Sequence, residues 1–127
     1  MKKVIFTKDA PAPIGPYSQA IEANGLLFVS GQIPLDPVTG AMVEGEIEAE
    51  THCVLRNVGA ILNARGLNFD NVVKSTIFVS DMANFARINA VYAEYFSGDT
   101  PPARETVQAA ALPKAVNIEI SVIATVN

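Results

Sequence analysis

Residues 116–126, VNIEISVIATV, close the chain with an alternation that determines how the fold is arranged. The even-numbered positions are apolar, and the odd-numbered positions are polar apart from Ile123. Successive side chains of a strand point to opposite faces of a sheet, so one face of this strand belongs to the core and the other carries Glu119. We therefore expect a sheet with one packed face and one partly polar face.

Two segments upstream have the spacing of amphipathic helices. Apolar residues recur every three or four positions across residues 47–65, and Gly66 is the expected stop. Ser80 and Asp81 offer N-cap chemistry for a second helix, which must end before the Pro101-Pro102 pair.

Short strands account for most of the remaining chain. They are expected at residues 4–6, 19–23, 26–30, 72–79 and from Arg104 onward, with Asn24-Gly25 as a two-residue hairpin turn. Strand–helix–strand crossovers are right-handed, which places both helices on one face of the sheet. This order predicts an α+β fold with a mixed six-stranded sheet and two helices on one face.

A chain of 127 residues has room for one core, so residues 1–127 are expected to form a single domain. With both helices on one face, the face that carries Glu119 lies open. An open and partly apolar face indicates packing against another molecule, most simply further copies of the same chain.

The composition limits which kinds of binding partner and which cellular compartment are expected. The chain has 9 basic and 13 acidic residues, a net charge of −4 and no cluster of Lys and Arg. This argues against nucleic acid or an anionic membrane as a partner. No stretch approaches the ~18 apolar residues of a membrane-spanning helix, and no signal-peptide pattern is visible. Cys53 is the single cysteine, so a cytoplasmic location is expected.

Arg104 and Glu119 are the strongest candidates for chemistry. The Arg104 guanidinium could hold a carboxylate through two parallel hydrogen bonds, or it could form a surface ion pair with Glu105. Glu119 stands between two isoleucines. It could be a solvated residue on the outer face or, if that face is covered, a proton acceptor with a raised pKa.

Four further positions are ambiguous by themselves. Tyr17 could contact a ligand or cap the edge of the core. Ser30 and Gly31 end a strand, where Gly31 could let a ligand approach the backbone or simply form a turn. Asn89 lies on the second helix at a position expected to be exposed.

A site built on histidine and cysteine is not expected. His52 and Cys53 are the single residues of their types. They are neighbours on the first helix, where adjacent side chains do not face each other. Neither a Cys/His dyad nor a metal site is therefore predicted.

Several separate motifs resemble the RidA (YjgF) family of reactive intermediate deaminases, which is also labelled endoribonuclease L-PSP. The resemblance runs the length of the chain with nearly the family's spacing, which makes it more specific than any single motif. The motifs are Ile14-Gly15-Pro16-Tyr17-Ser18-Gln19, Val29-Ser30-Gly31-Gln32-Ile33-Pro34, Pro102-Ala103-Arg104, Leu112-Pro113-Lys114 and Ile118-Glu119-Ile120.

The resemblance implies a fold and an assembly. The family fold is chorismate-mutase-like, and three subunits bring their sheets together around a three-fold axis. The active sites lie in clefts between subunits. A homotrimer is therefore expected, in agreement with the open sheet face.

The resemblance also implies a reaction. Family members hydrolyse 2-enamine and 2-imine acids, such as 2-aminoacrylate or 2-iminobutanoate, to 2-keto acids and ammonia without a metal or organic cofactor. Arg104 matches the arginine that holds the substrate carboxylate, and Glu119 matches the glutamate that positions water. The matching substrate-binding positions are Tyr17, Ser30, Gly31, Asn89 and Thr106.

Two positions depart from the family pattern. Thr106 stands where the best-known bacterial members have cysteine, but the family contact there is largely a backbone N–H, which threonine keeps. Glu105 stands where a small residue is usual. It should point away from the side of Arg104, since a bend in the opposite direction would make it compete for the guanidinium.

Two other functions remain open beside the deaminase. One is a non-catalytic trimeric binder of keto acids or similar metabolites that uses the same Arg104 pocket. The other is a ribonuclease or translation inhibitor, an older label of the family. The acidic balance and the single histidine weigh against RNA cleavage.

Overall fold

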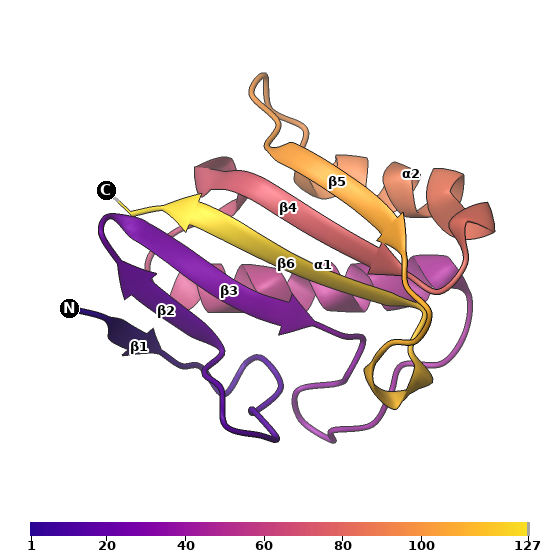
Figure 1. The fold of residues 1–127 in the computed structure, drawn as a ribbon, viewed down its shortest axis with the longest axis horizontal. Coiled ribbons are helices and arrows are strands. Elements are labelled where there is room, and N and C mark those ends of the chain that lie inside the picture. Colours follow the sequence, from indigo (N-terminus) through magenta and orange to yellow (C-terminus); the bar gives the residue numbers. More distant parts are fainter. Residues whose placement is uncertain (127) are drawn as a thin grey trace.

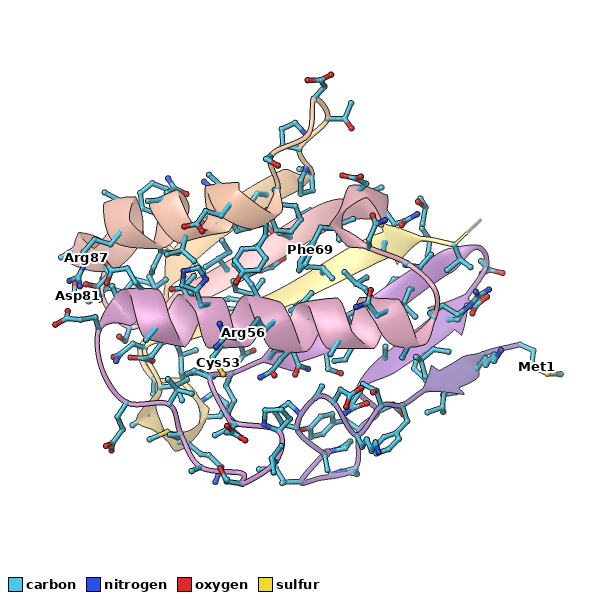
Figure 2. The ribbon with its side chains drawn as sticks, turned by 180° about the vertical axis from the view of Figure 1, so that it is seen from behind. Met1, Cys53, Arg56, Phe69, Asp81 and Arg87 are labelled. Atoms are coloured by element: carbon cyan, nitrogen blue, oxygen red, sulfur yellow. The ribbon has the colours of Figure 1, made fainter. Side chains whose placement is uncertain are left out.

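Strand β6 (Ile118–Thr125) lies in the middle of a six-stranded mixed sheet in the computed structural model, which describes residues 1–126 (Figure 1). The helices α1 (Ile47–Ala64) and α2 (Phe85–Tyr95) both pack on one face, as Figure 2 shows from behind. The predicted fold class and helix placement are confirmed. The remaining strands are β1 (Lys3–Ile5), β2 (Ala20–Ala23), β3 (Leu26–Gln32), β4 (Val72–Val79) and β5 (Ala103–Gln108).

The strands follow the order β1-β2-β3-β6-β4-β5. β6 is antiparallel to both neighbours, whereas β4 and β5 are parallel and are connected through α2. Pairing of β3 with β6 shifts register between Val29 and Gln32, which leaves one extra residue on β3 at Ser30-Gly31. Such a β-bulge bends the strand locally. β5 ends the sheet, so its outer edge is unpaired.

The alternation of β6 divides the sheet as predicted. Its helix-facing side chains are at most 2% exposed, and they are Ile118, Ile120, Val122 and Ala124. They pack against the fully buried stripe of α1, formed by Val54, Leu55, Val58, Ile61 and Leu62. α2 adds Ile88, Val91 and Tyr92. No helix within residues 1–126 is both long and apolar enough to span a bilayer.

Strand β2 begins at Ala20 instead of residue 19, and the Gln19 side chain bonds to the loop before the strand. The Gln19 side chain is 2% exposed, accepts a hydrogen bond from the Thr7 N–H at 2.8 Å and donates to the Thr7 and Pro11 carbonyls. These bonds hold the loop between β1 and β2, which includes Tyr17. The predicted β1, at residues 4–6, lies one residue earlier in the structure.

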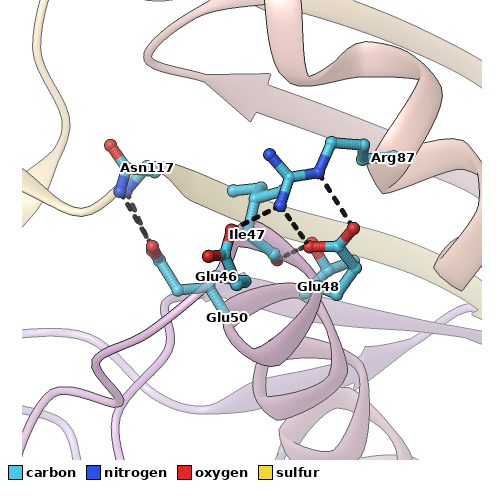
Figure 3. A network of polar contacts seen from close by, with 7 residues as sticks. Glu46, Ile47, Glu48, Glu50, Arg87 and Asn117 are labelled. Carbon is cyan, nitrogen blue, oxygen red and sulfur yellow. Dashed lines mark hydrogen bonds and ion pairs between the residues drawn. The ribbon is translucent and has the colours of Figure 1, made fainter.

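The first turn of α1 is tied to two other elements (Figure 3). On its solvent side, Arg87 of α2 donates hydrogen bonds to Glu46 and Glu48 at 2.6–2.9 Å. On its inner side, Glu50 accepts hydrogen bonds from Asn117. The Arg87 side chain is 45% exposed, whereas Glu50 is 7% exposed. Water therefore screens the first set of contacts much more than the second.

Arg87→Ala is expected to lower the free energy of unfolding by less than about 1 kcal/mol, because exposed ion pairs contribute little. Leu55→Ala removes a fully buried side chain and is expected to cost about 2–5 kcal/mol. Urea denaturation at a fixed subunit concentration measures both changes. A larger loss for Arg87→Ala would mean that the network of Figure 3 is a main support of the fold.

Candidate functional site

Glu119 is the second residue of β6 and projects from the face without helices. Its side chain is half-buried, and desolvation raises the pKa of its carboxyl, with no hydrogen bond or cation among residues 1–126 to offset the effect. A carboxylate that is partly desolvated and unpaired accepts protons closer to neutral pH than a solvated one does. Glu119 is therefore suited to take a proton from water.

Gly31 lies directly beside the Glu119 side chain. A Cβ built on Gly31 would stand 2.8 Å from the Glu119 carboxyl carbon and 3.0 Å from its Cγ. Gly31 is not among the residues with positive φ, so glycine is required here by contact and not by backbone conformation. Any side chain at this position would displace the carboxylate.

The Glu119 carboxylate faces an open hollow of about 380 Å³. Tyr17 is 51% exposed, so its phenol borders the hollow instead of closing the core. The Ser30 hydroxyl donates to the Ser18 carbonyl at 2.6 Å and thus fixes the loop. The structure brings four of the predicted site residues together here. The lining consists of Ile14, Tyr17, Ser30, Gly31, Ile33, Pro113 and Glu119.

Arg104 lies on the other face of the sheet, beneath α2. Its guanidinium donates a hydrogen bond to Asn89 Oδ1 at 2.7 Å. The guanidinium carbon lies 4.9 Å from the centroid of the Tyr92 ring and 5.7 Å from that of Phe85. None of the ion pairs within residues 1–126 involves Arg104. The cation is thus oriented by an amide and two aromatic rings, and it keeps donors free for an anion.

Asn89, Tyr92 and Phe85 have roles that sequence reasoning missed. Asn89 was expected to be exposed, but it is half-buried and orients Arg104. Tyr92 and Phe85 are not among the site residues predicted from the sequence. The Tyr92 hydroxyl donates to Ser75 Oγ at 2.9 Å, which fixes the ring beside the guanidinium. The spacing of these three residues, i, i+4 and i+7, marks one helix face and could have indicated a shared contact.

Thr106 lies two residues after Arg104 and therefore on the same face of β5. Its hydroxyl is buried and has no hydrogen-bond partner in the described part of the chain. The Ala109 N–H donates to the Val79 carbonyl of β4 at 2.8 Å. Successive residues of a strand direct their N–H groups to opposite sides. Thr106 is three residues before Ala109, so its N–H points away from β4, to the unpaired edge of the sheet. Thr106 thus offers a backbone donor on the strand that holds Arg104.

Glu105 points to the open face, away from Arg104. It pairs with Lys74 at 3.3 Å and accepts a hydrogen bond from the Thr76 hydroxyl at 3.3 Å. The prediction that Glu105 faces away from Arg104 is confirmed. The alternative of an ion pair between Arg104 and Glu105 is wrong.

Arg104 and Glu119 do not meet within one chain. Arg104 is level with Ser75 of β4, which is level with Val122 of β6, three residues from Glu119. At about 4.8 Å between strands and about 3.4 Å per residue, their Cα atoms lie about 14 Å apart. Their side chains also leave opposite faces of the sheet. One small acid cannot contact both residues of the same chain.

The single histidine and cysteine form no dyad. His52 Nδ1 contacts the Tyr95 hydroxyl at 2.7 Å, whereas the Cys53 thiol donates to the Leu35 carbonyl. Burial raises the pKa of the Cys53 thiol, which makes it a poor nucleophile. Residues 1–126 contain no group of three His, Cys, Asp or Glu side chains placed to hold a metal ion.

The family model described as Endoribonuclease L-PSP matches residues 7–126. The chain belongs to the RidA (YjgF) family. A RutC family protein of Pyrococcus horikoshii is 55% identical over 98% of this chain and 98% of its own length. A mouse protein named 2-iminobutanoate/2-iminopropanoate deaminase is 46% identical over 98% of this chain and 91% of its own length.

A solved RidA-family structure has the same fold. The crystal structure of E. coli TdcF with bound serine superposes with a TM-score of 0.93 at 41% identity and covers 98% of this chain and 99% of that one. The resemblance first inferred from sequence motifs is thus established at the level of family and fold.

Gly31→Ala is expected to push the Glu119 carboxylate toward water and to lower its pKa toward the ordinary value, because the burial that raises it is lost. The midpoint is measured by ¹³C NMR of labelled glutamate carboxyls, with Glu119→Gln assigning the signal. Gly15→Ala is the matched control, since its Cβ would meet Tyr17 only at 3.6 Å. An unchanged midpoint in Gly31→Ala would contradict the contact argument.

Proposed function

We propose that this protein hydrolyses 2-enamine and 2-imine acids, such as 2-aminoacrylate and 2-iminobutanoate, to 2-keto acids and ammonia. The proposal rests on the half-buried, unpaired Glu119 carboxylate beside Gly31, in a chain that also holds Arg104 free of carboxylate partners. The name of the mouse relative supports the same substrate class. A cytoplasmic location, in keeping with the single cysteine, is part of the proposal.

The chemistry follows from the two groups. An enamine acid tautomerises to its imine, whose carbon is electrophilic once the nitrogen is protonated. Glu119 accepts a proton from water as the water oxygen bonds to that carbon. The resulting carbinolamine takes that proton from Glu119 on its nitrogen, and the C–N bond breaks as ammonia leaves. The hydroxyl proton is lost to solvent as the carbonyl forms, which balances the proton that the imine took up. Water is the sole co-reactant, and the carboxylate is not consumed.

Arg104 holds the substrate carboxylate in this scheme. A guanidinium with free donors forms charge-assisted, bidentate bonds to a carboxylate, and the Thr106 N–H supplies a further donor. Tyr17 and the apolar walls of the hollow exclude bulk water around the reacting carbon. Fixing the acid relative to Glu119 converts attack by water into a reaction of preset geometry.

The site is completed by a second copy of the chain. Because Arg104 and Glu119 of one chain lie about 14 Å apart on opposite faces, the acid is held by Arg104 of one subunit and hydrolysed at Glu119 of another. We propose a homotrimer with three such clefts, in which the open sheet faces pack together. The exposed apolar side chains of this face support association, and they include Phe28, Val73 and Val107.

The assay generates 2-aminoacrylate or 2-iminobutanoate with a dehydratase and measures keto-acid release. The wild-type protein is expected to accelerate release. Arg104→Ala should abolish most of this acceleration by raising KM. Glu119→Gln should reduce kcat by ~100-fold or more. Because the pKa of Glu119 is raised, kcat should fall on the acid side at a higher pH than for a solvated glutamate.

Equal rates with and without the protein would refute the deaminase. Keto-acid binding that is lost in Arg104→Ala would then favour the metabolite binder. Cleavage of RNA by rigorously purified protein would favour the ribonuclease.

Mixing two inactive variants tests the shared site. In hybrids of Arg104→Ala and Glu119→Gln chains, some clefts receive both intact residues from different subunits. Random association into trimers should restore about a quarter of wild-type activity. Ultracentrifugation checks the trimer. No recovery in verified hybrids would mean that the two residues do not act from different subunits, which would contradict the shared site.

A further inference from the structure

Glu119 lies near the end of a central strand, where its support is one-sided. Pairing of β6 with β4 includes Phe78 and Glu119, but pairing with β3 ends at Gln32 and Ile120. On the β3 side, the ladder resumes after the bulge for this one pair and then ends with the strand, so Glu119 has no paired residue there. Before Glu119, Ile118 is fully buried and pairs with Val79 of β4. Asn117, which directly precedes β6, is then held by its polar groups.

Asn117 uses all four of its hydrogen-bonding groups. Its backbone N–H and its side-chain amide donate to the two carboxylate oxygens of Glu50 at 3.2 Å and 2.8 Å. Its carbonyl accepts from the Ser80 N–H at 3.1 Å, and its side-chain oxygen accepts from the Ser80 hydroxyl at 2.8 Å. Asn117 thus joins Glu50 in the first turn of α1 (Figure 3) to Ser80 at the end of β4.

Glu50 is the unusual member of this clamp. It is 7% exposed, and none of the ion pairs within residues 1–126 involves it. A buried carboxylate is costly unless hydrogen bonds and local dipoles compensate. The two hydrogen bonds from Asn117 offset part of the cost of burying the Glu50 carboxylate. The first turn of α1 offsets a further part, because its free N–H groups favour negative charge. The burial of the Glu50 carboxylate at this energetic cost is best explained by its hold on Asn117.

We propose that Glu50 is a positioning residue, which acts through Asn117 to set the direction and depth at which Glu119 enters the hollow beside Gly31. It touches neither the hollow nor the substrate. Its catalytic consequence rests on the proposed function of Glu119. The placement of the Glu119 carboxylate can nevertheless be measured without any reaction.

Glu50→Ala removes both acceptors from Asn117. The start of β6 should then loosen, and the Glu119 carboxylate should gain contact with water, so that its titration midpoint falls toward the ordinary glutamate value. The same ¹³C carboxyl titration measures this. Tyr17 lines the same hollow as Glu119. The Lys74–Glu105 pair lies on the same open face, where Lys74 is level with Ile123 of β6, four residues from Glu119.

Two matched variants separate positioning from general loss of stability. Glu50→Gln should keep the wild-type midpoint, because the Asn117 amide can flip and the Ser80 hydroxyl can rotate to close the network again. Glu48→Ala breaks an exposed contact to Arg87 in the same helical turn and leaves Asn117 untouched. It should also leave the midpoint unchanged.

The deaminase assay supplies a second readout. Glu50→Ala should lower kcat by ~10–100-fold and leave KM within about twofold, because the reacting water is misplaced while Arg104 still binds the acid. Glu50→Gln should restore kcat. A role in stability alone would lower the melting temperature without this division between kcat and KM.

A wild-type Glu119 midpoint in folded Glu50→Ala would overturn the proposal, whatever its rate. If Glu50→Ala does not fold, Asn117→Ala takes its place, since it keeps the backbone bond to Glu50 and must still lower the midpoint. If wild type lacks deaminase activity, the proposed function fails, and the titration still decides the role of Glu50.

Discussion

The two-residue period of the strands is the constraint on which the rest of this molecule depends. In β6 it directs Ile118 and Ile120 into the core and Glu119 to the opposite face. In β5 it directs Arg104 toward α2 and Glu105 toward the open face. No choice of rotamer can bring groups together through a packed sheet. The geometry that builds the core therefore divides the candidate site into two halves.

Each half contains a polar group that folding leaves incompletely satisfied. Glu119 is desolvated without a partner, the Thr106 hydroxyl is buried without one, and Arg104 is a cation held by aromatic rings and an amide. Elsewhere buried polar side chains such as Gln19 are fully bonded. In the proposed function, these two groups of unsatisfied side chains lie where the ligand and a second subunit would contribute contacts.

Much of this was accessible from the sequence because it is local. Alternation in residues 116–126, helical spacing in residues 47–65 and the Asn24-Gly25 turn depend on neighbours a few positions apart, and the structure has all three. The contacts of Tyr92 with Arg104 and of Gly31 with Glu119 join residues far apart in the chain. No local pattern specifies which residues will be adjacent across strands, so these contacts could not be predicted.

The sequence by itself determined the elements, the core face of each strand and the identity of Arg104 and Glu119 as chemically distinctive residues. Side-chain period and turn chemistry are properties of the local chain, and the family motifs add their order. Only the tertiary structure decided that the two residues lie on opposite faces, that Glu119 lies against a glycine and that Glu50 accepts hydrogen bonds from Asn117. These facts depend on strand order, register and burial, which arise when distant segments pack together.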